Sequence, residues 1–253
     1  MTEYVAKLPN APLQEVIFEI HWDLDLLEGN VIQDPRFELA QGIFASKIQS
    51  NFPNYKRILP ANFPLIVPYK PVHQFWRAEN TWPVIQLGQG MMTVNDTEKN
   101  YIWEDSFELL IKSAIEVLLE SYNNDIKFKS LSLRYINAVG ISPDTKLQDF
   151  ISKNLKIDIR KTFAIPGTLS DISFSESYTL SDESALSLNI NTGHKGNIKH
   201  KALIWQITVS KNNLLSSEHI DQWLKYAHSY TSNLFRQMLS EEFYDSFKRK
   251  NNN

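Results

Sequence analysis

The sequence predicts an α+β fold in which two halves of the chain follow one plan. Residues 129–140 alternate strictly, with Leu131, Leu133 and Tyr135 on one side and Ser132, Arg134, Ile136 and Ala138 on the other, as in a half-buried strand. Each half also reads strand, helix, three strands, helix. We therefore expect a tandem β-α-β-β-β-α duplication, residues 1–126 and 127–253 packed as one globular unit. Its strands would form a curved, mostly antiparallel sheet with long helices packed on one face.

The first half opens with a strand predicted over residues 13–22. Apolar Val16, Phe18, Ile20 and Trp22 share one face, whereas Glu15, Ile17, Glu19 and His21 share the other. Residues 23–30 break this alternation and are predicted to form a loop. A helix is predicted over about 34–51, with Asp34 as its N-cap, Pro35 in its first turn and an apolar stripe at Phe37, Ala40, Phe44 and Ile48.

Five prolines between residues 53 and 72 predict an extended connecting segment. Three short strands are expected next, at 73–78, 83–88 and 91–95, separated by turns at 79–82 and 88–90. A helix over about 102–123 completes the first half, because Trp103, Phe107, Leu110, Ile111, Ala114, Val117 and Leu118 recur at helical spacing.

The second half repeats this order after the 129–140 strand. A short helix is expected near 146–154, followed by an irregular segment over 157–170 that contains Pro166-Gly167. Strands are predicted at 171–180, 184–191 and 200–210, and a long helix over about 217–239. Ser240 is expected to cap one more helical turn at 243–247, before a polar tail.

Composition bounds the class of protein. With 42% hydrophobic and 22% charged residues the chain is typical of a soluble globular protein rather than a disordered one. It has no cysteine, which excludes disulfides, thiol catalysis and cysteine-bound metal. No apolar run is long enough to span a bilayer and the first residues lack a signal-peptide pattern, so we expect a cytoplasmic protein without a membrane partner.

Charge is distributed unevenly between the halves. Residues 1–126 hold 9 Lys/Arg and 17 Asp/Glu, a net −8, whereas residues 127–253 hold 17 and 12, a net +5. Such a dipole could steer a partner or favour self-association, and the alternative is ordinary variation among solvated charges.

Four segments, in order, resemble a sporadically distributed family of uncharacterised bacterial proteins of about 250 residues. They are PLQEVIFEI at Pro12–Ile20, YIWEDSF at Tyr101–Phe107, LRYIN at Leu133–Asn137, and the helix segment Ala227–Phe235 with its AH-x6-F spacing. The resemblance covers nearly the whole chain and carries over no activity and no catalytic or ligand residues. The patchy distribution of the family implies horizontal transfer and hints at mobile-element or phage-defence contexts.

Arg134 is the first candidate site residue, because it lies in the middle of a predicted strand. The first strands of duplicated halves often lie close together, so we expect Arg134 to pair with Glu19 or Glu15 through its guanidinium fork. This pair could line a pocket for an anionic ligand or simply fix the sheet register. His21 shares the Glu15/Glu19 face, but no second histidine cluster accompanies it, so we predict neither a metal site nor a cofactor.

A partner surface is the second candidate. Trp76 and Trp82 flank a turn, where they could pack in the core or contact another protein. Lys195, Lys199 and Lys201 form a basic hairpin tip that, with Lys127, Lys129 and residues 248–250, could touch phosphates. The sequence pI of 6.1 does not favour nucleic acid as the main ligand.

The sequence contains no recognisable catalytic motif, although it leaves a Ser/His/Asp triad open. There is no Gly-x-Ser-x-Gly elbow and no glycine-rich phosphate loop, and His228 is expected to pack against its helix rather than act as a base. We therefore predict a non-catalytic interaction module, as a homodimer or a subunit of a larger complex. The alternative is a binder of nucleic acid or of a small anionic ligand through the concave sheet.

Overall fold

The computed structural model describes residues 7–60, 67–97, 99, 101–158, 162–194, 201–212 and 218–249. These residues form a mixed α and β structure with one large sheet. Its strands are β1 (Leu13–Trp22), β4 (Asn54–Arg57), β5 (His73–Trp76), β6 (Val84–Gly88), β7 (Met91–Asp96), β8 (Phe128–Gly140), β9 (Ser173–Thr179), β10 (Ala185–His194) and β11 (Lys201–Asn212). The helices are α1 (Phe37–Ile48), α2 (Glu108–Ser121), α3 (Leu147–Asn154), α4 (Glu218–Met238) and α5 (Glu241–Ser246).

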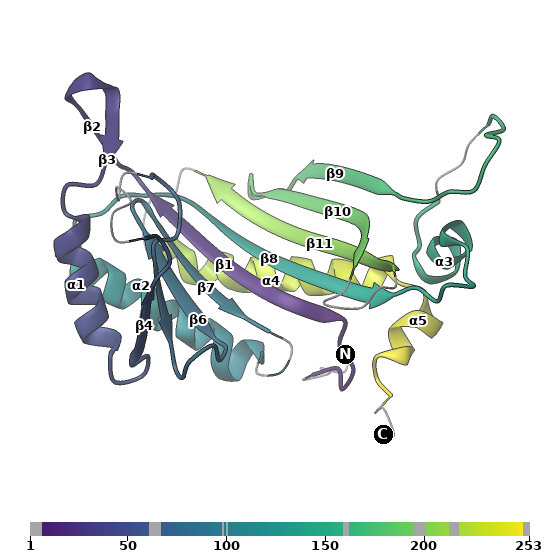
Figure 1. Cartoon of the computed structure of the whole chain (residues 1–253), viewed down its shortest axis with the longest axis horizontal. Coiled ribbons are helices and arrows are strands. Elements are labelled where there is room, and N and C mark those ends of the chain that lie inside the picture. The colour runs from purple at the N-terminus through teal and green to yellow at the C-terminus, as the bar shows by residue number, and fades with distance from the viewer. Residues whose placement is uncertain are drawn as a thin grey trace. The chain divides into compact units, whose positions relative to one another are not determined.

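The hydrogen-bonded order of the strands is β4-β5-β6-β7-β1-β8-β11-β10-β9 (Figure 1). Strand pairing is antiparallel for β4 with β5, β5 with β6, β6 with β7, β7 with β1 and β9 with β10. The prediction of an α+β fold with a large antiparallel sheet is therefore confirmed. None of the helices in the described part of the chain combines the length and apolar character that a membrane crossing requires.

The chain divides into two compact units. Unit 1 comprises Met1–Gln14, Arg134–Val209 and Tyr226–Asn253, and unit 2 comprises Glu15–Leu133 and Ser210–Lys225. These bounds differ from the predicted halves, 1–126 and 127–253, because β1, β8, β11 and α4 each contribute residues to both units. The units are described separately below.

In unit 2 the alternation of β1 separates a buried face from a half-buried one. Val16, Phe18, Ile20 and Trp22 are at most 1% exposed. The register places Phe18 opposite Val94 on β7, Val94 opposite Ile85 on β6, and Ile85 opposite Phe75 on β5. Side chains at directly opposed positions share a face, so this row forms the apolar floor of the unit. Burying each of these side chains contributes about 1.5–3 kcal/mol.

Two helices cover the apolar floor of unit 2. The rings of Phe44 on α1 and Phe75 on β5 lie 5.6 Å apart, and the rings of Trp22 and Tyr122, just beyond α2, also lie 5.6 Å apart. The predicted α1 stripe of Phe37, Ala40, Phe44 and Ile48 is buried. A π-helical turn, η2 (Trp103–Phe107), precedes α2, and its Phe107 N–H donates to the Ile102 carbonyl.

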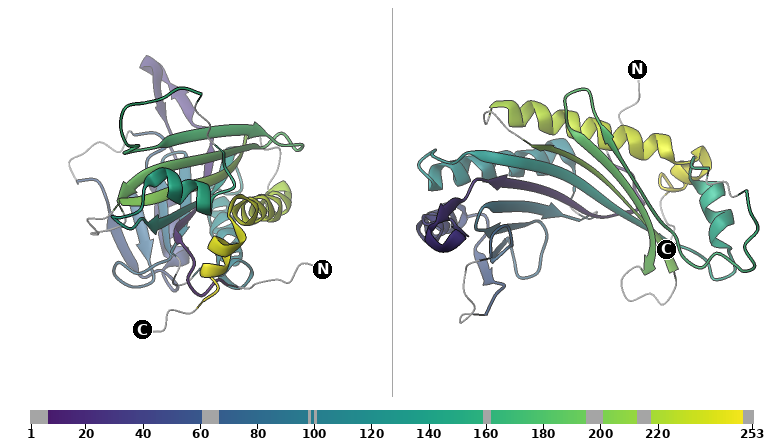
Figure 2. Two further views of the ribbon diagram at one scale, coloured as in Figure 1. Left: turned by 90° about the vertical axis from the view of Figure 1, so that its right-hand side faces the viewer. Right: turned by 90° about the horizontal axis from the view of Figure 1, so that it is seen from above.

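In unit 1 the residue before β1 is bonded to β8, and α5 packs against α3. The Ala138 N–H donates to the Pro12 carbonyl at 2.9 Å. This bond joins the residue before β1 to the end of β8. The rings of Phe150 on α3 and Phe243 on α5 lie 5.9 Å apart, and the two short helices lie side by side (Figures 1 and 2). Ser240 caps α5 as predicted, because its Oγ accepts from the Phe243 N–H.

Two predictions about unit 2 are wrong in detail. Residues 23–30 were expected to form a loop, but β2 (Asp25–Leu27), a single 3-10 turn η1 (Glu28–Asn30) and β3 (Val31–Gln33) form a two-stranded hairpin. The segment 53–72 was expected to be only connecting, but residues 54–57 form β4, which pairs with β5. A proline-rich segment can contain such a strand because no proline falls within 54–57.

Candidate functional site

The predicted ligand residues of β1 all lie on the half-buried face of unit 2. Glu15 Oε1 accepts a hydrogen bond from Asn95 Nδ2 at 2.8 Å. Glu19 Oε1 lies 3.1 Å from His21 Nε2, and the His21 ring also lies 5.2 Å from the ring of Tyr69. Each of the three residues thus has a neighbour from its own unit. Among the described residues, no three metal-ligating side chains converge.

A polar row crosses the sheet on this same face. The register places Glu19 opposite Thr93, Thr93 opposite Gln86, Gln86 opposite Gln74 and Gln74 opposite Lys56. Thr93 Oγ1 donates to Gln86 Oε1 at 3.3 Å. Beside this row, the buried Oδ1 of Asn95 has no hydrogen-bond partner among the residues that the structure describes. The sequence predicted the β1 members of this surface but not the members from β4 to β7.

Arg134 lies half-buried on β8, in unit 1. Glu15 and Glu19 belong to unit 2, so the predicted ion pair would join the two units. That pairing stays a prediction. The strands β1 and β8 are neighbours in the sheet order.

The predicted partner surface is described only in part. Trp76 and Trp82 are both half-buried and meet edge to face with their rings 5.7 Å apart. Within the described part of the chain, the buried Nε1 of Trp76 has no acceptor. Lys201 Nζ lies 3.2 Å from Asp171 Oδ1 and also contacts the Ser170 carbonyl. Lys195 and Lys199 lie outside the described residues.

His228 packs inside unit 1, in agreement with its predicted packing role. Its Nδ1 lies 2.9 Å from the hydroxyl of Tyr135 on β8. Burial lowers the pKa of His228 to about 4, so the imidazole is neutral at pH 7. A neutral ring can hold one hydrogen bond to Tyr135 without placing a charge in the core.

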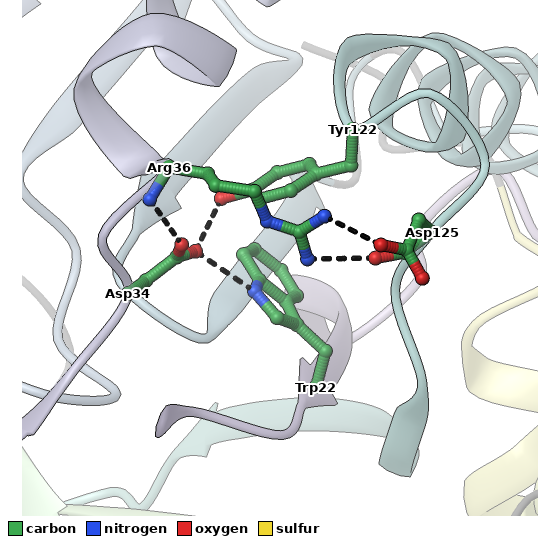
Figure 3. Close-up of polar contacts among 5 residues, drawn as sticks. All are labelled: Trp22, Asp34, Arg36, Tyr122 and Asp125. Carbon is green, nitrogen blue, oxygen red and sulfur yellow. Dashed lines mark hydrogen bonds and ion pairs between the residues drawn. The ribbon is translucent and has the colours of Figure 1, made fainter. Parts of the chain in front are cut away.

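A buried carboxylate ties three elements of unit 2 together (Figure 3). Asp34, 7% exposed, lies just after β3, and its Oδ2 accepts from Trp22 Nε1 at 3.2 Å and from the Tyr122 hydroxyl at 2.6 Å. Its Oδ1 accepts from the Arg36 N–H at 3.0 Å. We call Trp22, Asp34 and Tyr122 the clamp. It joins the end of β1, the start of α1 and the end of α2.

The surroundings of the clamp keep its donors protonated and in place. Burial raises the pKa of Tyr122, and the adjacent Asp34 carboxylate raises that pKa further, so the hydroxyl keeps its proton and donates it. The Asp34 N–H in turn donates to Gln89 Oε1 at 3.1 Å. At the surface, Arg36 closes the group by pairing with Asp125 at 2.9 Å (Figure 3). The Asp34 carboxylate thus accepts three hydrogen bonds from donors of its own unit, and these link β1, α1 and α2.

The hairpin above the clamp has the opposite character. We call residues 25–33 the arm; Figures 1 and 2 show it projecting from the rest of unit 2. Its four large aliphatic side chains are all exposed, at 69% for Leu26, 39% for Leu27, 37% for Val31 and 46% for Ile32. Leu26 pairs with Ile32 and Leu27 pairs with Val31 across the hairpin.

The clamp sets the base of the arm. Trp22 and Asp34 are the residues at the two ends of the segment 23–33, and their hydrogen bond holds those ends together. At the tip, Gly29 and Asn30 both have positive φ, 76° and 59°, which closes the chain reversal. Sequence reasoning missed the arm, although Gly29-Asn30 between two aliphatic pairs is a turn signal that could have identified it.

The comparisons with known proteins add no relative. No family model matches the chain, and no curated protein or solved structure matches it either. Function is therefore inferred from the arrangement of side chains described above.

Proposed function

We propose that this protein is a non-catalytic interaction module and that the arm is its contact element. The single observation that supports the proposal is the exposure of Leu26, Leu27, Val31 and Ile32 on one projecting hairpin. Isolated exposed aliphatic residues are ordinary on protein surfaces, but a contiguous group of them is typical of an interaction site. Burying such a side chain in a partner contributes about 1.5–3 kcal/mol when burial is complete.

The clamp supports the same proposal, because it fixes the arm before any partner arrives. A two-stranded hairpin is marginally stable alone in water, and ordering it on binding would oppose association. Here the Trp22–Asp34 hydrogen bond closes the base of the arm as part of folding. In this proposal the buried polar groups of the clamp serve to present the arm.

Affinity purification from the native host, with light scattering on the purified protein, tests the proposal. The variant Leu26→Ser/Ile32→Ser removes the aliphatic pair from one face of the arm. Leu109→Ser is the matched control, because Leu109 on α2 is 57% exposed and lies in the same unit. We expect the arm variant to lose partners that the parent protein and the control retain. Equal recovery with all three proteins would contradict the proposal.

We also propose that the chain is a tandem duplication, as the sequence predicted. Support comes from the strand order: β1 neighbours β7, then β6, then β5, and β8 neighbours β11, then β10, then β9. The first strand of each half therefore pairs with the last strand of the same half, with α1 and α2 or α3 and α4 at equivalent places in the chain. β4 and the arm are additions to the first half. A crystal structure whose two halves fail to superpose would refute the duplication.

For the biological setting, the proposal relies on the family that the sequence resembles. We propose a bacterial cytoplasmic protein that works as a homodimer or a complex subunit, associated with defence or mobile elements. Light scattering and the identity of the purified partners test these points in the same experiment.

Ligand binding through the sheet is a second candidate function, and the polar row favours it. The row crosses five strands with a polar side chain at every position, although apolar side chains would fit the same face. Its members are Glu19, Thr93, Gln86, Gln74 and Lys56. Hydrogen-bonding groups suit a polar ligand, but the carboxylates of Glu15 and Glu19 oppose an anion. A thermal-shift screen of the parent protein against Gln86→Ala tests this candidate, with loss of a ligand-induced stabilisation as the expected result.

A further inference from the structure

The arm carries apolar side chains on both of its faces. Successive residues of a strand point to opposite sides, so Leu26 and Leu27 lie on different faces. The register pairs Leu26 with Ile32 and Leu27 with Val31, which gives each face one aliphatic pair. A flat partner surface could cover only one of these pairs. A partner that buries both must surround the arm.

The charged side chains of the arm and of the residue pair before it are all acidic. Asp23, Asp25 and Glu28 are exposed, and residues 23–33 contain no Lys or Arg. A symmetric contact between two arms would bring three carboxylates from each copy together, which opposes it. The same charges repel nucleic acid and anionic lipid surfaces.

We propose that the arm inserts into a cleft of a different protein, with apolar walls and with Lys or Arg side chains around its mouth. This inference rests on the proposed function and names the partner's chemistry. The walls take the two aliphatic pairs, and the basic mouth meets the carboxylates near the arm's base and tip. Because the clamp already holds the base, the arm enters as a preformed ribbon and loses little conformational freedom.

Site-specific photocrosslinking in the native host tests the two-faced geometry. Benzoylphenylalanine replaces Leu26 in one variant, Leu27 in a second and Leu109 in a control, each in the full-length chain. The three positions are exposed and belong to unit 2, but only the first two are on the arm, one on each face. We expect positions 26 and 27 to crosslink the same second protein, identified by mass spectrometry, and position 109 not to do so.

The identified protein is then purified to test the charges. Its affinity for the parent chain is expected to fall roughly tenfold when both Asp25→Asn and Glu28→Gln are introduced, and to fall as salt is raised, because exposed charge pairs are screened. Asp105→Asn on η2, also acidic and exposed, is the control and should leave the affinity unchanged.

The possible failures separate this inference from the function on which it rests. A crosslink from position 26 or 27 alone overturns the cleft but keeps the arm as a contact element. A crosslink between two copies of this chain overturns the claim that the partner is a different protein, but the arm remains a contact element. An affinity insensitive to salt and to both charge changes overturns the basic mouth. Crosslinking from the arm no stronger than from position 109 overturns both the inference and the proposed function.

Discussion

The arm and the clamp beneath it place side chains in opposite environments. In the arm, aliphatic residues such as Leu26 meet water, whereas in the clamp the carboxylate of Asp34 is shielded from it. Three hydrogen bonds from donors of its own unit stabilise the buried Asp34 carboxylate. The arm has no such compensation within its described contacts. The buried polar group therefore has its hydrogen-bond partners within its own unit, whereas the exposed apolar group is the one that we propose to bind another molecule.

The largest effect is expected on removing the clamp carboxylate. Asp34→Ala leaves the Trp22 N–H, the Tyr122 hydroxyl and the Arg36 N–H without their acceptor, so the free energy of unfolding should fall by about 3 kcal/mol. Urea unfolding measures this change. Asp125→Ala is the control, because Asp125 is 82% exposed, and it should cost less than about 1 kcal/mol. Equal losses of unfolding free energy in both variants would show that the clamp carboxylate contributes no more to stability than an exposed one.

A half-buried polar contact in unit 1 sharpens the comparison, because His228 is neutral where Asp34 is a carboxylate. The pKa of His228 is lowered to about 4 in the folded state, below the ordinary value of 6.5. As the pH falls from about 6.5 to about 4, the unfolded chain binds a proton that the folded chain does not. The free energy of unfolding should therefore decrease over this window, by about 3 kcal/mol in total for this group.

Urea unfolding as a function of pH measures the contribution of His228. In His228→Gln the decrease between pH 6.5 and pH 4 should be smaller than in the parent protein by that amount. A variant with the parent's full pH dependence would show that the imidazole is not held neutral.

A smaller effect is expected when the clamp keeps its carboxylate and loses one donor. Tyr122→Phe removes only the hydroxyl that lies 2.6 Å from Asp34 Oδ2, so the free energy of unfolding should fall by about 1.5–2 kcal/mol. Urea unfolding beside Asp34→Ala gives the comparison directly. A loss as large as that of Asp34→Ala would mean that the Tyr122 hydroxyl alone accounts for the effect of the carboxylate.

The smallest effect on stability is expected in the arm itself. Leu26→Ser/Ile32→Ser changes side chains that are already in water, so the free energy of unfolding should change by less than about 0.5 kcal/mol per site. The same variant is expected to lose its partner. A large loss of stability would show that the arm packs against its own chain and would weaken its assignment as a contact element.

The sheet strands could be predicted because alternation is a local signal. Val16, Phe18, Ile20 and Trp22 mark β1 without reference to any other residue, and the same holds for Leu131 and Leu133 in β8. The arm has no such alternation. Its aliphatic residues come as adjacent doublets. An alternating pattern arises when one face of a strand is buried, and neither face of the arm is buried within the described chain.

The clamp could not be predicted because its members are far apart in the chain. Trp22 and Asp34 are separated by 12 positions, and Asp34 and Tyr122 by 88. The sequence predicts Asp34 as the N-cap of a helix over about 34–51, and this is wrong: α1 begins at Phe37, and its N-cap is Arg36, without a side-chain cap hydrogen bond. Asp34 Oδ1 instead accepts from the Arg36 N–H ahead of the helix. Its second oxygen accepts from Trp22 and Tyr122, which only the tertiary fold brings close to Asp34.

The shortness of the arm has a consequence for solubility. A long aliphatic ribbon with open edges would be a template for fibril growth, since neighbouring molecules could add strand upon strand. β2 and β3 pair over only three positions, and the carboxylates of Asp25 and Glu28 border them. The short pairing and the bordering carboxylates therefore oppose aggregation through the exposed aliphatic residues of the arm.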